Sequence, residues 1–177
     1  MAQVLEAFAK RFLNDPLSAT IESMPPSSHE FESGRQTGHN GRLLINAAGT
    51  IWLVDNGYAR GYVREELFTR IHYWRITRRE CYLGTGCSDV TRPVNLYRIV
   101  NHPSELGIEE HAPYSDNIRL IRNPETGETF HYENNLKRWI PGMNVFHLYQ
   151  FDWDDVQNYT PAVINGIPRG DDIQART

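Results

Sequence analysis

The fold is decided by the stretch RLLINAAGTIWLVDNGYARGYVREELFTRIHYW, residues 42–74, because it recurs as RLIRNPETGETFHYENNLKRWIPGMNVFHLYQFDW, residues 119–153. One inserted residue in the loop before the glycine brings these two units into register. The aligned pairs then include Arg42 with Arg119, Gly49 with Gly127, Asp55 with Glu133, Asn56 with Asn134, Arg60 with Arg138 and Phe68 with Phe146. A duplicated supersecondary unit usually packs on its copy to bury a common face.

Each unit carries the pattern of a β-hairpin followed by a short helix. Asn56-Gly57 is the strongest hairpin signal in the chain, since both residues accept a positive φ. Asn134-Asn135 stands at the same place in the second unit and tolerates the same conformation. Apolar residues at helical spacing follow both hairpins. The sequence therefore predicts strand, turn, strand, turn, strand and helix in each unit.

We predict an α+β, β-rich fold in which the two units pack on one core. An N-terminal amphipathic helix and a polar arm are expected over residues 1–41, with the helix presenting one apolar face made of Val4, Leu5, Phe8, Phe12 and Leu13. The body, residues 42–177, divides into repeat one at about 42–76, a connecting segment at about 77–115 and repeat two at about 116–170.

Local signals outside the repeats are weaker. An alternating pattern predicts a strand over residues 94–100, and Ser104 is expected to cap a short helical turn. The tail after residue 150 is expected to be an extended polar and aromatic segment.

The bulk properties exclude several classes of partner. The net charge of −4 argues against a general nucleic-acid binder, which usually carries a basic surplus. No stretch approaches the roughly 20 apolar residues of a membrane-spanning helix. The N-terminal residues lack the charged and then apolar pattern of a secretory signal. We therefore expect neither a nucleic-acid partner nor membrane insertion, and a location in the cytoplasm or in a virion.

The cysteines, Cys81 and Cys87, are separated by YLGTG. This is not the Cys-x-x-Cys spacing of a redox site, and two residues alone cannot make a structural zinc site. The pair could close a small disulfide in a protein that works outside the cell, or stay as free thiols in a reducing cytosol. The sequence leaves both states open.

Charged residues recur beside the hairpin turn of each unit. Asp55 and Arg60 flank the first turn, and Glu133 and Arg138 flank the second. Because a guanidinium can bind a carboxylate with two parallel hydrogen bonds, we expect an ion pair inside each unit. The alternative is that Arg60 and Arg138 contact a ligand.

Aromatic residues supply the main candidates for ligand binding. Sugar rings stack on exposed aromatic faces that have polar groups nearby. Strand alternation sends about half of such residues inward, so core packing is the alternative for any one of them. Trp139 and Trp153 are the best exposed candidates, because polar or charged neighbours flank both. The full candidate set is Trp52, Tyr58, Arg60, Tyr132, Arg138, Trp139 and Trp153, with Tyr62 as a further aromatic.

Signals for catalysis and for cofactors are missing from the sequence. No His-Glu-x-x-His pair and no Gly-x-Ser-x-Gly elbow occurs. Asp152, Asp154 and Asp155 are acidic neighbours, but they lack the spacing of an EF-hand calcium loop and its closing glutamate. We expect no catalytic residues, no metal and no cofactor.

The second unit resembles a short repeat found at the ends of bacterial secreted and cell-surface proteins, including some cell-wall amidases. That repeat runs Gly-Thr-x-aromatic-Leu-x-x-Asn-Gly-x-x-Arg-x-Ile-Pro, then an apolar-Phe pair and Phe-Asp-Trp-x-Asp-Val. The matching residues are Gly127, Phe130, Asn134, Arg138, Trp139, Ile140, Pro141, Val145, Phe146 and the run from Phe151 to Val156. The first unit matches from Gly49 to Val54 and at Asn56, Gly57, Arg60 and Phe68, but it lacks the proline and the Phe-Asp-Trp segment.

The resemblance implies a non-catalytic attachment module for an envelope surface; envelope glycan is one candidate ligand, and the pattern does not fix which ligand is bound. Because the chain shows no secretory signal, a structural component of a bacteriophage virion, such as a tail, fibre or capsid-associated protein, would fit both observations. We therefore expect a binding or assembly module that joins other protein subunits in an oligomer or larger assembly. The alternatives are a small hydrolase acting on cell wall or glycan, and an intracellular protein-interaction domain.

Overall fold

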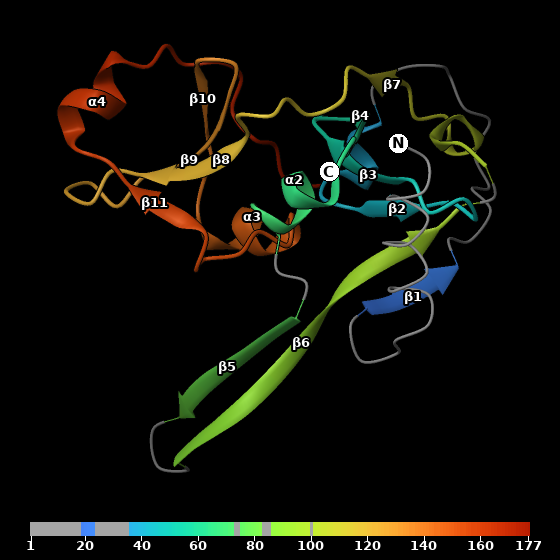
Figure 1. Ribbon diagram of the computed structural model, residues 1–177, viewed down its shortest axis with the longest axis horizontal. Coiled ribbons are helices and arrows are strands. Elements are labelled where there is room, and N and C mark those ends of the chain that lie inside the picture. Colours follow the sequence, from blue (N-terminus) through green and yellow to red (C-terminus); the bar gives the residue numbers. More distant parts are fainter. Residues whose placement is uncertain (1–18, 24–35, 73–74, 83–85, 100) are drawn as a thin grey trace.

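The computed structural model describes residues 19–23, 36–72, 75–82, 86–99 and 101–177 (Figure 1). The predicted N-terminal helix and most of the predicted arm lie outside these residues. What is described is β-rich with a few short helices, as the sequence predicts.

The two units fold in the same order of elements. The first consists of β2 (Leu43–Ile45), β3 (Ile51–Asp55), β4 (Tyr58–Gly61) and α2 (Glu65–Thr69). The second consists of β8 (Arg119–Arg122), β9 (Thr129–Glu133), β10 (Leu136–Trp139) and α3 (Met143–Leu148). In each unit the three strands form an antiparallel meander. The predicted duplication is therefore confirmed at the level of elements.

Each unit belongs to its own sheet. In the larger, seven-stranded sheet the order is β1-β6-β2-β3-β4-β7, with β5 paired to β6. Its added strands are β1 (Ala19–Ser23), β5 (Arg75–Tyr82), β6 (Gly86–Arg98) and β7 (Glu110–His111). The four-stranded sheet has the order β10-β9-β8-β11, where β11 is Val156–Asn158. Figure 1 shows the two sheets side by side, with the β5–β6 hairpin extending away from both.

The asparagine turns adopt the conformation that the sequence predicts. Asn56 and Gly57 have φ values of 50° and 86°, and Asn134 and Asn135 have values of 50° and 61°. Two successive left-handed residues are typical of a tight turn whose twist matches that of the strands. These turns fix the register of β3 with β4 and of β9 with β10.

An asparagine just ahead of each unit holds the turn in place. The Oδ1 atom of Asn40 accepts a 2.6 Å hydrogen bond from the backbone N–H of Gly57. The Oδ1 atom of Asn117 likewise accepts a 3.0 Å bond from the N–H of Asn134. Asn40 and Asn117 are aligned in the repeat, so the duplication extends two residues before the arginine that opens each unit.

The units pack on a single hydrophobic core. Equivalent positions enter it from both sides, such as Phe68 from α2 and Phe146 from α3. Apolar burial of this kind contributes roughly 25 cal/mol per Å² and dominates the stability of a small domain. The aligned core pairs are Leu43 with Leu120, Tyr62 with Ile140, Leu67 with Val145, Phe68 with Phe146, and Ile71 with Tyr149.

Different elements cover the outer faces of the two hairpins. Trp52 faces outward in the first unit and packs against a cluster that includes Leu106 and Ile108. The segment that supplies those residues contains a short 3-10 helix, Pro103–Leu106. Phe130, the aligned residue in the second unit, packs instead against Ile164 of α4 (Pro161–Gly166).

The C-terminal segment contacts both units. Ile173 is buried in the shared core, and its N–H bonds to the carbonyl of Trp139 in the second unit at 2.9 Å. The next residue, Gln174, donates its N–H to Asn56 Oδ1 in the first unit at 2.9 Å. Two adjacent residues, Ile173 and Gln174, thus bond to β10 of the second unit and to the asparagine turn of the first unit.

Three local predictions need correction. The connecting segment contains a long β-hairpin, β5–β6, and β6 begins well before residue 94. His102, and not Ser104, caps the 3-10 helix, because its ring accepts a hydrogen bond from the N–H of Ser104. The tail is not wholly extended, since Pro161 opens the short helix α4, a position where its missing N–H costs nothing.

Candidate functional site

Charged residues meet at the junction between the units, but they pair differently from the prediction. Arg138 of the second unit binds Asp55 of the first through two hydrogen bonds of 2.6 and 2.8 Å. Arg60 of the first unit binds Glu133 of the second through bonds of 2.7 and 2.8 Å. The strong pairs are thus crossed between units, although Arg60 also lies 3.7 Å from Asp55. The reciprocity is that of a two-fold interface, where residue i meets j and j meets i.

The crossed pairs hold both carboxylates in the ionised form. Burial of Asp55 acts to raise its pKa, but the charge and hydrogen bonds of Arg138 outweigh burial and lower the pKa to about 2. Burial opposes ionisation of Glu133 too, and Arg60 again lowers the pKa. Neither group can serve as a general acid near neutral pH, and neither arginine is free to bind a ligand carboxylate through both arms of its guanidinium.

A buried tyrosine, Tyr114, contacts residues of both crossed ion pairs. Tyr114 donates its hydroxyl to Asp55 at 3.0 Å, and the guanidinium carbon of Arg60 lies 4.1 Å from the centre of its ring. Tyr114 is itself fully buried. The junction therefore buries both carboxylates, while the side chains of Arg60 and Arg138 stay 16% and 15% exposed.

Two histidines lie buried in the same core. His72 Nε2 is 2.6 Å from the hydroxyl of Tyr62, and burial lowers the pKa of His72 to about 3. Neither ring nitrogen of His131 has a hydrogen-bond partner within the described part of the chain. Burial, reinforced by Arg138, lowers the pKa of His131 to about 4. Both are neutral core residues at physiological pH.

The aromatic candidates do not form one platform. Trp52 is only 4% exposed, and its indole N–H donates to Glu110 at 2.9 Å. Tyr62 is 3% exposed and packs against Tyr114. The candidate assignment of Trp52 to a ligand site is therefore wrong, because residues from outside the repeat cover its face of the sheet.

Three candidates line a groove between the two asparagine turns. Tyr58, Arg60 and Arg138 border a hollow of about 470 Å³ that also includes Asp171. The ring of Tyr58 is stacked on His111 with centroids 3.6 Å apart. Since both arginines are bound to carboxylates and Tyr58 is stacked on His111, this groove offers few free recognition groups.

Tyr132 lines a different pocket, on the outer face of the smaller sheet. This pocket of about 210 Å³ is bordered by Tyr159, Val163 and Ile167 beside α4. The Tyr132 hydroxyl already donates to Asn135 at 2.8 Å. Tyr132 is thus separate from the other candidates.

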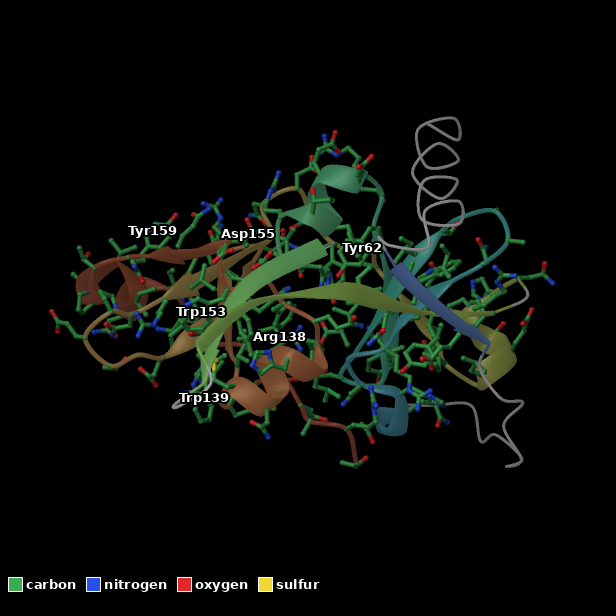
Figure 2. All side chains as sticks on the ribbon, turned by 90° about the horizontal axis from the view of Figure 1, so that it is seen from below. Tyr62, Arg138, Trp139, Trp153, Asp155 and Tyr159 are labelled. Carbon is green, nitrogen blue, oxygen red and sulfur yellow. The ribbon has the colours of Figure 1, made fainter. Side chains whose placement is uncertain are left out.

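Trp139 and Trp153, the two candidates favoured by the sequence, line one pocket (Figure 2). Its volume is about 250 Å³. Trp139 ends β10, and Trp153 follows α3 and packs edge-on against Phe146 with centroids 5.2 Å apart. Both tryptophans are partly buried, so one part of each side chain packs against the protein and another part is accessible to solvent. We call this the tryptophan pocket; its other lining residues are Thr126, Gly127, Glu128, Thr129, Ile140, Gly142, Met143 and Phe146.

The tryptophan pocket combines apolar and polar groups. Met143 is 46% exposed, so part of its large apolar side chain is open to solvent beside the hollow. Thr126 and Glu128 come from the turn between β8 and β9, where the hydroxyl of Thr126 donates to Glu128 at 2.9 Å. Flat apolar surfaces with a few polar groups at the margin are typical of small-ligand sites.

The first unit has no equivalent of this pocket in its sequence. Trp139 aligns with Gly61, Met143 with Glu65, and Trp153 with Arg75. Sequence reasoning found both tryptophans from their polar neighbours but missed Met143. The register between the units was the signal that could have found it, because it shows an apolar residue in the second unit where the first has a charge.

Acidic residues near the pocket do not form a metal site. Within the described ranges no group of three or more histidine, cysteine or acidic residues is placed to hold a metal ion. Asp152 accepts a hydrogen bond from the N–H of Asp154 at 3.0 Å, which makes a local turn. Burial, with the charges of Asp152 and Asp154, raises the pKa of Asp155 to about 6.

The cysteine prediction falls largely outside what can be described. The register of β5 with β6 places Cys81 opposite Cys87 on the backbone. Their side chains lie outside the described residues, so the disulfide stays a prediction. Among the helices that are described, none has the length and apolar character to cross a bilayer.

Comparison with known proteins gives no relative: the chain matches no protein-family model, and neither curated proteins nor solved structures are significantly similar to it.

Proposed function

We propose that this protein is a non-catalytic binding module that attaches to glycan of the bacterial envelope through the tryptophan pocket. In this proposal it is a structural component of a virion or a comparable assembly. The observation that carries the proposal is the convergence of Trp139 and Trp153, which lie on either side of α3 in the sequence, on one hollow of about 250 Å³. The resemblance of the second unit to an envelope repeat supports the choice of glycan.

The chemistry of the pocket suits a sugar ring. A pyranose presents a face of C–H groups to an indole and hydroxyls to polar groups at its edge. Trp139 and Trp153 offer the apolar surface, while Thr126 and Glu128 offer hydroxyl and carboxylate partners. A hollow of this size accommodates about one ring, and repeated units along a polymer would add avidity.

The charged junction supports binding over catalysis. Glycoside hydrolysis needs two carboxyl groups about 5–10 Å apart with one of them protonated. Asp55 and Glu133 are instead both ionised by their arginines and lie in a packed junction. A hydrolase would therefore have to use acids other than Asp55 and Glu133.

The proposal is tested by retention on purified bacterial cell-wall material. Trp139→Ala and Trp153→Ala should each lose retention while keeping the circular dichroism spectrum of the natural protein. Tyr58→Ala is the matched control, since Tyr58 is a partly exposed aromatic residue outside the pocket. Retention should persist at high salt, because stacking is not screened as ion pairing is.

Two results would contradict the proposal. Equal retention of all three variants would place binding outside the tryptophan pocket. Release of soluble sugar during the same incubation would favour the hydrolase alternative.

A second role, in assembly, is favoured by the β5–β6 hairpin. This hairpin extends from the body in Figure 1 as two long strands that pair with each other. An isolated two-stranded hairpin is only marginally stable in water, so a projecting one gains stability when a partner covers it. The molar mass of the free protein in solution, compared with that of a chain lacking residues 77–91, tests this role. A monomer in both cases would argue against self-assembly through the hairpin.

A further inference from the structure

We propose that the tryptophan pocket selects a sugar that carries a carboxylate, and that Arg122 is the residue that recognises this charge. The inference rests on the proposed function, because it names the class of glycan that the same pocket would bind.

Arg122 lies beside the pocket at the end of β8. Its guanidinium carbon is 5.7 Å from the centre of the Trp153 ring. Its Nη2 atom is 3.7 Å from the position that a Cβ on Gly127 would take. Trp153 and Gly127 both line the pocket. A carboxylate on a ring seated against Trp153 is therefore within reach of this guanidinium.

Among the residues that the structure describes, no acid pairs with Arg122. Within the described residues it forms no ion pair, and its buried Nε–H has no hydrogen-bond partner. A buried donor without a partner destabilises the folded state, so its presence in a native structure calls for an explanation such as the binding of a ligand. An incoming carboxylate would supply the opposite charge through Nη2, the guanidinium atom that lies near Gly127 of the pocket lining.

Arg169 provides an internal contrast. Its guanidinium lies over the other pocket tryptophan, Trp139, at 5.4 Å. Unlike Arg122, it is bound to Asp172 through two hydrogen bonds of 2.8 and 3.0 Å. Asp172, and more weakly Glu128, raise the pKa of Arg169 and so stabilise its charged form. Arg169 is thus paired with an acid, whereas Arg122 has no ion pair among the described residues.

The repeat shows that the scaffold does not require an arginine at this position. Arg122 aligns with Ile45, which is buried in the shared core of the first unit. An apolar residue therefore satisfies the fold here. Arg122 differs from the first unit together with Trp139, Met143 and Trp153, which are the residues that distinguish the pocket.

The experiment compares matched pairs of sugars by isothermal titration: glucuronic acid against glucose, and N-acetylmuramic acid against N-acetylglucosamine. The acid of each pair should bind the natural protein at least about tenfold more tightly, as expected for a hydrogen-bonded charge pair. Arg122→Gln should abolish this preference but retain binding of the neutral sugar. Arg122→Lys should retain part of it, and Arg169→Gln, which also removes one positive charge beside the pocket, should leave it unchanged.

Each other outcome overturns a specific step. Equal binding of acid and neutral sugars to the natural protein would refute the inference and leave the proposed function standing. An equal loss of preference in Arg122→Gln and Arg169→Gln would show a general field effect and would also refute it. If no sugar binds and wall material does not retain the protein, the proposed function itself fails.

Discussion

The first and second units share a scaffold and differ in what they expose. Both have the same three strands, the same left-handed turn and the same helix, and they enter the core at equivalent positions. At the tryptophan pocket the second unit has Trp139 and Met143 where the first has Gly61 and Glu65. Shared positions therefore indicate what the fold needs, and the divergent positions include the residues to which the proposed function assigns ligand binding.

The crossed ion pairs belong to the shared part. An acid is the last residue of β3 and of β9, and an arginine lies in the return strand of both units. Because each acid binds the arginine of the other unit, the pairs require both units to be folded and docked. We therefore expect the crossed ion pairs to make the two units unfold together.

The largest expected effect comes from breaking one crossed pair. Asp55→Asn leaves the partly buried Arg138 without its counter-charge, and should lower the free energy of unfolding by about 3–5 kcal/mol. Glu133→Gln is the matched change in the second unit. It should lower the free energy of unfolding clearly less. In this variant Arg60 still lies 3.7 Å from Asp55 and still donates a hydrogen bond to the carbonyl of Ala112. Urea unfolding measures both, and a larger cost for Glu133→Gln would contradict the assigned geometry.

A smaller loss is expected from loosening the C-terminal segment. Ile173→Ala removes a fully buried side chain from the shared core and should cost about 2–4 kcal/mol. Val163→Ala, also near the C-terminus but 48% exposed, is the control and should change stability little. Equal unfolding midpoints for the two variants would show that this segment does not join the units.

The pH dependence of stability tests one position at which the two units differ. His131 aligns with Leu53, so His131→Leu gives the second unit the residue of the first. Burial lowers the pKa of His131 from 6.5 to about 4 in the folded protein. Below pH 6.5 the unfolded chain takes up a proton that the folded chain does not, so stability falls as the pH drops.

His131→Leu removes this contribution. Its free energy of unfolding should fall less between pH 7 and pH 5 than that of the natural protein, by about 2 kcal/mol. Unfolding curves at the two pH values measure the difference. Parallel losses in both proteins would mean that His131 is protonated as readily folded as unfolded.

The smallest effect on stability is expected at the pocket itself. Met143→Glu places the residue of the first unit on an exposed position of the second, and should change stability by less than about 0.5 kcal/mol. Retention on cell-wall material should nevertheless fall. The reciprocal change, Glu65→Met, should produce no new retention, since Gly61 offers no indole. Undiminished retention of Met143→Glu would remove Met143 from the site.

The sequence predicted the hairpins because their determinants are local. Asn56-Gly57 and Asn134-Asn135 specify a turn without help from the rest of the chain. The partner of Asp55 could not be predicted in this way, because spacing within a unit says nothing about how two units dock. The different exposure of Trp52 and Trp139 could not be predicted either, because it depends on which distant segments cover each strand. Residues near Leu106 bury Trp52, and no local pattern indicates that they return to cover its strand.

The central claim is that the second unit binds ligand and the first serves as scaffold. The most direct test follows the indole N–H resonances of the tryptophans while soluble fragments of cell-wall glycan are added. The account predicts that the signals of Trp139 and Trp153 shift in a saturable manner and that the signal of Trp52 stays in place. A shift of Trp52 without a shift of Trp139 and Trp153 would contradict it.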